Sequence, residues 1–240
     1  MSSKPKLVVC VNQVAVLRAS RGGSEPDPVH FAMQAELAGA LGIRGHLRID
    51  RAYLNEQDME FLNRQCQTPF YLQISPHQDV VHLINTLRPN YVILCAERRD
   101  DRIGESGLDA TLLAQELAGI IKNIDTRQTR VFLLVEADLD QVKTAAKLGV
   151  HGLLLNVREL MLDPADLTTQ KRFGHLKDAV RLGFKYGIEM HLGGGVTAQR
   201  VADLVAIPGL SGIHVGHQLV ARSLLLGAQA CVKNYLGLIS

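Results

Sequence analysis

Residues 188–217 read IEMHLGGGVTAQRVADLVAIPGLSGIHVGH, and this segment contains one complete unit of the fold. An apolar run at 188–193 ends in three glycines, a stretch with helical spacing follows at 197–206, and a second apolar run begins after Pro208. Short apolar runs without strict alternation are typical of parallel strands that are covered on both faces. The segment therefore predicts a strand, a turn, a helix and another strand in succession.

The same unit repeats along the whole chain. Helical start signals separate the apolar runs; Asp27-Pro28, for example, joins a capping residue to proline at the first helical position. Strands that are each followed by a helix predict a closed (β/α)₈ TIM barrel with extra short helices in its connections, and a doubly wound open sheet is the alternative. The eight predicted strands are 6–12, 42–48, 69–75, 91–96, 130–137, 151–157, 188–193 and 210–216. The predicted helices are 27–41, 56–65, 77–87, 109–124, 138–148, 178–186, 197–206 and 218–236.

Composition favours a single barrel domain over residues 1–240 with an aliphatic interior. Hydrophobic residues make up 47% of the 240 residues, whereas aromatic residues make up 5% and tryptophan is absent. Branched aliphatic side chains fill the interior of such barrels. The formal net charge of +2 gives no reason to expect nucleic acid or a membrane surface as a partner.

The cysteines indicate a reduced, cytoplasmic protein. They are scattered and form no Cys-x-x-Cys pair, so we expect core thiols rather than a zinc site or a disulfide framework. No apolar run reaches membrane-spanning length. No group of His, Asp and Glu has metal-site spacing, and no dinucleotide fingerprint appears, so no metal and no cofactor is expected. The cysteines are Cys10, Cys66, Cys95 and Cys231.

The turns after the last two predicted strands carry the strongest signal for a ligand. Gly193, Gly194 and Gly195 precede a helix, and Gly216-His217 opens the last one. Glycine lets backbone N–H groups approach an anion closely, and a helix N-terminus adds its dipole. In barrels of this class these two turns commonly bind phosphate. A phosphorylated small molecule is therefore the predicted ligand, although three glycines could also make only a tight turn.

The end of the second predicted strand carries the candidate acid–base residue. His46 and Arg48 are two residues apart and therefore point to the same side of the strand. His46 could exchange a proton near neutral pH, and Arg48 could bind a phosphate or a carboxylate. Arginines in the first and fourth connections would suit a ligand with two phosphates, although surface ion pairs explain each one singly. These arginines are Arg18, Arg21, Arg98 and Arg99.

Two connections are longer than the fold requires. Glu97–Leu108 follows the fourth predicted strand, and Arg158–Lys177, with a short extra helix, follows the sixth. Both lie on the face where barrel enzymes keep their sites, so they are candidate lids or ligand loops. A solvated, charged loop is the alternative for each.

Five segments spread along the chain form a recognisable set: HLRIDR at 46–51, ERRDDRIGESGLD at 97–109, VFLLVEAD at 131–138, GGGVT at 193–197 and IHVGH at 213–217. These segments resemble the pyridoxine 5′-phosphate synthase family of the bacterial vitamin B6 pathway. The similarity covers essentially the whole chain and its loop lengths.

This resemblance implies an oligomeric barrel that condenses 1-deoxy-D-xylulose 5-phosphate with 3-amino-2-oxopropyl phosphate without a metal or organic cofactor. It implies that Asn12 and Arg21 hold the phosphate of the amino ketone. It further implies that His46 is an acid–base residue and that Arg48 contacts the pentulose phosphate. The residues implied to lie at a phosphate are Gly195, Gly216 and His217.

The departures from the family pattern fall where the chemistry should be. Gln73 stands at the family's catalytic glutamate on the third strand, Leu154 at its glutamate on the sixth, and Gly194 at its catalytic histidine after the seventh. Gln73 can hydrogen-bond but cannot titrate, and Leu154 and Gly194 can do neither. The first connection, at 12–15, lacks the family's Asp-His pair, and Ile103 replaces a threonine.

These substitutions predict a protein that still binds phosphorylated metabolites but whose condensation chemistry is impaired or altered, because each general acid or base contributes about 10²–10⁴ in rate. A working synthase in which His191 or Glu136 replaces the missing groups is the first alternative. A non-catalytic assembly or regulatory protein is the second. The retained glycines and arginines favour ligand binding over a scaffold, which has no need of an anion site.

Overall fold

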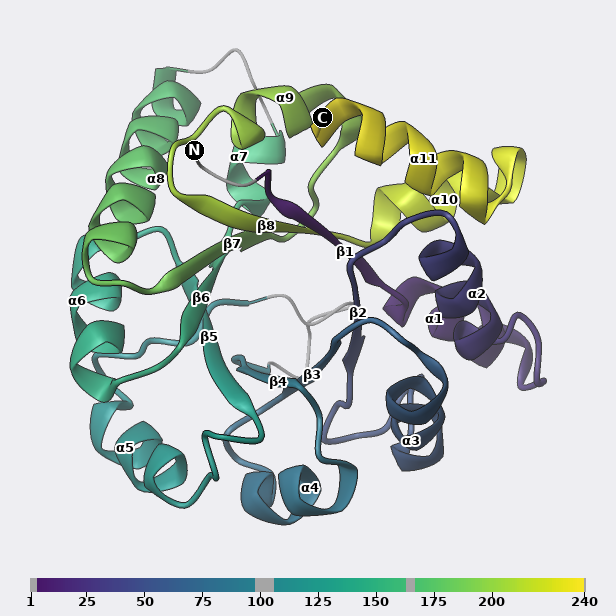
Figure 1. Ribbon diagram of the computed structural model, residues 1–240, viewed down its shortest axis with the longest axis horizontal. Coiled ribbons are helices and arrows are strands. Elements are labelled where there is room, and N and C mark those ends of the chain that lie inside the picture. The colour runs from purple at the N-terminus through teal and green to yellow at the C-terminus, as the bar shows by residue number, and fades with distance from the viewer. Residues whose placement is uncertain (1–3, 98–105, 163–166, 240) are drawn as a thin grey trace.

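Eight parallel strands form a closed barrel in the computed structural model, which describes residues 4–97, 106–162 and 167–239. The strands pair in sequence order and β8 returns to pair with β1, which excludes the open sheet. Figure 1 shows the helices around the outside of this ring. The strands are β1 (Lys6–Cys10), β2 (Gly42–His46), β3 (Phe70–Ile74), β4 (Tyr91–Leu94), β5 (Arg130–Glu136), β6 (Gly152–Asn156), β7 (Glu189–Gly193) and β8 (Leu210–Val215).

The helices begin and end largely where the sequence signals them. Asp27 caps α2 by accepting a hydrogen bond from the N–H of Val29, and Asn55 and Asp58 form a capping box at the start of α3. Gly149 ends α6 in the left-handed conformation. The described helices are α1 (Asn12–Arg21), α2 (Pro28–Leu37), α3 (Glu56–Gln65), α4 (Val80–Leu87), α5 (Ala114–Lys122), α6 (Leu139–Leu148), α7 (Arg158–Leu162), α8 (Leu167–Lys185), α9 (Ala198–Val205), α10 (His217–Leu226) and α11 (Ala228–Ile239).

Three segments differ from the prediction. Residues 12–21 form α1, where no helix was predicted. The predicted loop Arg158–Lys177 is largely helical, because it contains α7 and the first half of α8, whose later turns bury apolar side chains against the barrel. The predicted helix 218–236 is two helices, because Gly227 adopts a φ of 83° and a ψ of 150°, which no helix tolerates.

The barrel interior is not the aliphatic interior that the composition predicted. The ring of Tyr71 stacks on that of Tyr91 with centroids 4.1 Å apart, and Phe132 packs edge-on against both. Glycines make this possible: a Cβ on Gly152 would lie 2.2 Å from the Phe132 ring, and one on Gly42 would lie 2.8 Å from the Tyr71 ring. Large rings therefore fill the space that inward-facing glycines leave.

None of the described helices combines the length and the apolar character that crossing a membrane requires. The four cysteines are buried and free, as the scattered spacing predicted. Four histidines on or beside the outer helices are exposed: His30, His77, His82 and His175.

Candidate functional site

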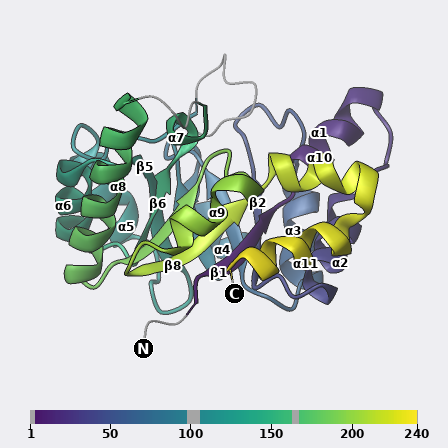
Figure 2. The ribbon, with the colours of Figure 1, turned by 90° about the horizontal axis from the view of Figure 1, so that it is seen from above.

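The carboxyl ends of the strands and the residues that follow them form the mouth of the barrel. Figure 2 shows α1 and α7 at this end, with the N-terminus at the opposite end. Parallel strands bring all their carboxyl ends to one face, so the candidate residues on β2, β7 and β8 meet there. Arg98, Arg99 and Ile103 lie outside the described residues.

His46 is the last residue of β2 and its side chain is completely buried. Its backbone N–H donates to Asn12 Oδ1 at 2.9 Å, which joins the end of β2 to the start of α1. Burial, together with the positive charges of Arg48 and Arg44, lowers the pKa of His46 to about 3, so the imidazole is neutral at pH 7. Among the described atoms, His46 Nδ1 and Asn12 Nδ2 are buried without a hydrogen-bond partner.

Glu97, which follows β4, reaches the same point. Both of its carboxylate oxygens accept from the N–H of Ile49, at 3.0 and 3.2 Å. Its Oε1 lies 3.6 Å from an Arg48 Nη, and its Oε2 lies 3.8 Å from His46 Nε2. The side chain is 5% exposed, and burial raises the pKa of its carboxyl group. The sequence placed Glu97 at the start of a loop but did not show that it contacts His46.

Arg48 points to the same side as His46, as predicted, but is already engaged. Its guanidinium forms two hydrogen bonds to Asp50, at 2.9 and 2.8 Å, and lies 6.0 Å from the centre of the Tyr53 ring. These bonds raise the pKa of Arg48, and its charge is therefore permanent. The Tyr53 hydroxyl is buried without a described partner, and burial raises its pKa.

The other two described arginines of the prediction, Arg18 and Arg21, belong to α1. Arg18 donates to both carboxylate oxygens of Asp58, at 2.7 and 2.6 Å, and so joins α1 to α3. Arg21 is exposed in the last turn of α1. It follows Asn12 by nine residues, about 14 Å along the helix, so the structure does not bring these two side chains together.

The two glycine turns do lie together. Gly194 and Gly195 have φ angles of 91° and 75°, which favour glycine, and Gly216 caps α10, whose first residue, His217, is exposed. The N–H of Ala198, at the start of α9, donates to the side-chain oxygen of Gln218 in α10, which ties the turn after β7 to the turn after β8. Gly193 is the last residue of β7 and is buried.

The three substituted family positions have different surroundings. Gln73 is buried on β3 and pairs in register with His46, whereas Leu154 belongs to the apolar cluster inside the barrel. At Gly194 a Cβ would lie 2.2 Å from Asn156 Oδ1. A side chain at position 194 would therefore require the side chain of Asn156 to move.

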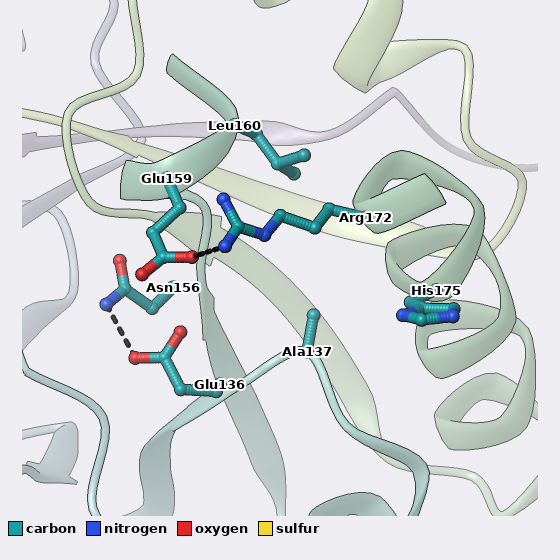
Figure 3. Close-up of a pocket in the computed structure, with 7 residues that line it drawn as sticks. All are labelled: Glu136, Ala137, Asn156, Glu159, Leu160, Arg172 and His175. Carbon is teal, nitrogen blue, oxygen red and sulfur yellow. Dashed lines mark hydrogen bonds and ion pairs between the residues drawn. The ribbon is translucent and has the colours of Figure 1, made fainter. Parts of the chain in front are cut away.

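A cavity of about 240 Å³ lies on the other side of the mouth, beside the ends of β5 and β6. Figure 3 shows Glu136 accepting a hydrogen bond from Asn156 Nδ2, at 2.8 Å, and Glu159 paired with Arg172, also at 2.8 Å. Glu136 is exposed, so a carboxylate is available here too. Among residues 4–97, 106–162 and 167–239, no three His, Cys, Asp or Glu side chains are placed to hold a metal ion.

His191 points into the barrel and not toward the mouth. Its Nδ1 lies 2.8 Å from His214 Nε2, and its Nε2 lies 3.1 Å from Glu189 Oε1. Glu189, at the start of β7, forms ion pairs with Arg130, at 2.7 Å, and with Lys6, at 3.6 Å. Both ring nitrogens of His191 are therefore occupied near the amino-terminal end of the barrel.

Comparisons with known proteins show the family and the fold of this chain. The pyridoxine 5′-phosphate synthase of Pelobacter propionicus is 34% identical over 235 residues, 98% of each chain. The synthase of Synechocystis is 31% identical over 229 residues, 95% of each. Solved structures with little sequence identity share the fold: KGPDC from Streptococcus mutans has a TM-score of 0.68 at 9% identity and covers 99% of this chain and 98% of its own. The family model for the pyridoxal phosphate biosynthesis protein PdxJ matches residues 7–240, and the chain therefore belongs to the PdxJ family.

Proposed function

We propose that this protein binds phosphorylated small metabolites at the mouth of the barrel and that its condensation chemistry is impaired or altered relative to pyridoxine 5′-phosphate synthases. The observation that carries the proposal is the contrast between retained and lost groups. Gly193, Gly195 and Gly216 remain at the two turns where barrels of this class hold phosphate, whereas Gln73 and Leu154 cannot titrate.

The position of Gly194 adds to this argument. In this structure the side-chain oxygen of Asn156 occupies the space where the Cβ of a histidine at position 194 would lie. A ring closure with loss of water needs several groups that give and take protons. His46, neutral and buried, is the family acid–base residue that remains, with Arg48 beside it as an anion-binding group.

A working synthase is the second candidate, and Glu97 is the observation that favours it. This carboxylate lies 3.8 Å from His46 Nε2 and has a raised pKa, so it could supply one of the missing acid–base groups. Glu136, exposed at the end of β5, could supply another. His191 does not support this candidate, because both of its nitrogens are engaged inside the barrel.

The test is formation of pyridoxine 5′-phosphate from the two family substrates by the purified protein and by His46→Ala, with His30→Ala, an exposed histidine on α2, as the control. We expect no turnover with any of the three. We also expect 1-deoxy-D-xylulose 5-phosphate and inorganic phosphate to raise the melting temperature. Turnover that disappears only in His46→Ala would overturn the proposal in favour of a working synthase. The absence of both turnover and stabilisation would favour the assembly or regulatory alternative.

Self-association and a cytoplasmic location belong to the same proposal. Leu224, Leu225 and Leu226 are 68%, 86% and 58% exposed at the end of α10, and three adjacent apolar side chains favour contact with a second copy. Sedimentation of the purified protein tests this, with Leu225→Glu as the variant expected to dissociate the oligomer. The phosphorylated ligand and the buried free thiols suit the cytoplasm.

A further inference from the structure

We infer that Glu97 is a positioning residue for His46: its carboxylate accepts the proton on Nε2 of the imidazole, which leaves Nδ1 unprotonated as the proton acceptor. The inference rests on the proposed function, in which His46 is the remaining acid–base group. It assigns a role to a residue outside the glycine turns and outside the three substituted positions.

The carboxylate is fixed before any ligand binds. The N–H of Ile49 donates to both oxygens, and Arg48 lies 3.6 Å from Oε1, so the other oxygen is left facing His46. The Oε2–Nε2 distance of 3.8 Å is longer than a hydrogen bond. At this distance the negative charge of the carboxylate still favours the tautomer whose N–H points toward it.

Cys95 is the competing neighbour, because its Sγ lies 3.6 Å from the same Nε2. A thiol that donated to Nε2 would put the imidazole proton on Nδ1. However, Sγ also lies 3.6 Å from the carbonyl oxygen of Ile74, to which it can donate. A thiol is a weak donor, whereas a carboxylate is a strong acceptor and makes charge-assisted bonds. Glu97 therefore determines which nitrogen carries the proton.

The surroundings of Nδ1 agree with this assignment. Nδ1 is buried and has no partner among the described atoms. A buried N–H without an acceptor is rarer in proteins than a buried acceptor without a donor, so an unprotonated Nδ1 is the less costly state. Asn12 Nδ2, on the residue that accepts from the His46 backbone, is a buried donor without a described partner. An acceptor and a donor together match a ligand hydroxyl group.

The charges around the imidazole explain why a carboxylate is needed. Arg44 and Arg48 both disfavour a proton on His46, whereas Asp50 favours one. When Nδ1 takes a proton, the imidazolium forms beside two guanidinium groups, and only a nearby negative charge offsets that repulsion. Among the described residues, Glu97 is the carboxylate in direct reach of the ring, in the way that an aspartate supports the histidine of a hydrolytic triad.

The test is the tautomer of His46, read from long-range ¹H–¹⁵N correlation spectra of the ¹⁵N-histidine-labelled full chain at neutral pH, without ligand. We expect the wild type to carry its proton on Nε2. In Glu97→Gln the Ile49 N–H continues to donate to the side-chain oxygen, so the NH₂ group of the glutamine faces Nε2 and donates to it. The tautomer ratio should then shift by about tenfold or more toward Nδ1–H, as expected for a charge-assisted hydrogen bond.

Two variants serve as controls. Cys95→Ser changes the other neighbour of Nε2, and Glu136→Gln removes a carboxylate across the mouth; both should keep the wild-type tautomer. The His191 and His214 signals, deep in the barrel, report in the same spectra whether each variant is folded. An Nδ1–H tautomer of His46 in the wild type overturns the inference. An unchanged tautomer ratio in folded Glu97→Gln also overturns it, as does a change from Nε2–H to Nδ1–H in Cys95→Ser. If Glu97→Gln does not fold, the wild-type and Cys95→Ser spectra decide.

The failure of this inference can be told apart from failure of the proposed function. The tautomer is measured without ligand, whereas the proposed function is tested by melting with phosphorylated compounds. A protein that phosphate stabilises but whose His46 carries its proton on Nδ1 would retain the ligand site and lose the role of Glu97. A protein that has the expected tautomer but is not stabilised by phosphate would retain the role of Glu97 and lack the ligand site.

Discussion

Two parts of this barrel pair a buried histidine with a carboxylate, and they differ in what is left unpaired. Inside the barrel, His191 contacts His214 and Glu189, and Glu189 is neutralised by cations at the amino-terminal end. At the mouth, His46 faces Glu97 through Nε2, and its Nδ1 has no described partner. His191 has both nitrogens engaged and contributes to folding, although its neighbour His214 keeps a buried Nδ1 without a described partner. His46, with an unused nitrogen at the carboxyl end of a strand, is available to a ligand.

The largest effect is expected from placing a third histidine at the mouth. Gly194→His puts a Cβ 2.2 Å from Asn156 Oδ1 on a backbone with a φ of 91°. Strain and collision together should cost about 4 kcal/mol of unfolding free energy, measured by urea denaturation. Gly195→Ala, with a φ of 75° and open space around its Cβ, should cost only about 1 kcal/mol. Equal losses in the two variants would show that position 194 is not closed by Asn156.

The interior pair should matter more for stability than the mouth pair. Glu189→Gln removes two ion pairs and should lower the unfolding free energy by about 2–3 kcal/mol, less than for a fully buried pair because Lys6 and Arg130 are partly exposed. Glu97→Gln keeps the bond from Ile49 and should cost less than about 1 kcal/mol. Urea denaturation of both variants checks this. A larger loss of unfolding free energy in Glu97→Gln than in Glu189→Gln would show that the pair at the mouth matters more for stability than the interior pair.

The pH dependence of stability should sharpen the comparison further. Burial lowers the pKa of His46, His191 and His214, so between each folded pKa and about 6.5 the unfolded chain binds protons that the folded chain does not. Stability is therefore complete above that range and falls as the pH falls, by up to about 1.4 kcal/mol per pH unit for each histidine. Urea midpoints between about pH 7 and pH 5 measure the slope. His46→Asn should reduce it, and an unchanged slope would mean that the imidazole is protonated in the folded protein.

Glu189 titrates lower in the same experiment. Burial alone raises its pKa, but the hydrogen bond from His191 and the charges of Arg130 and Lys6 lower it to about 2. Its contribution is present above its unfolded pKa and is lost as the pH falls toward 2.

A small effect is expected where the end of β2 meets the start of α1. Asn12→Ala removes the acceptor for the His46 N–H and should cost about 1 kcal/mol. It should also speed amide hydrogen exchange at His46 while leaving His191 unchanged. Asn85→Ala, exposed on α4, is the control and should change neither quantity. Exchange that stays slow at His46 would mean that Asn12 does not fix the end of β2.

Much of the fold could be predicted because its signals are local. Apolar runs that are separated by capped helices mark all eight strands. Asp27 and Asn55 cap the starts of α2 and α3, and Gly149 ends α6, at the positions that the sequence indicates. The missed helix α1 has no side-chain cap at its start, although Gly22 ends it in the left-handed conformation, and in α8 the apolar residues that pack against the barrel, such as Leu176 and Val180, lie in its later turns. The rings inside the barrel depend on glycines from neighbouring strands, a pairing that periodicity does not contain.

The candidate site was predicted in part for the same reason. His46 and Arg48 share one strand, so their common orientation follows from alternation alone. Glu97 comes from another strand, 51 residues later in the chain than His46, and only closure of the barrel brings the two within 3.8 Å.

The sequence by itself determined the strand and helix order, the glycine turns and the family, because these depend on residues close together in the chain or on overall similarity. The tertiary structure alone decided that both ring nitrogens of His191 are engaged inside the barrel and that the side chain of Asn156 lies against position 194. Those outcomes depend on distances between strands that meet only when the sheet closes, and no local pattern encodes them.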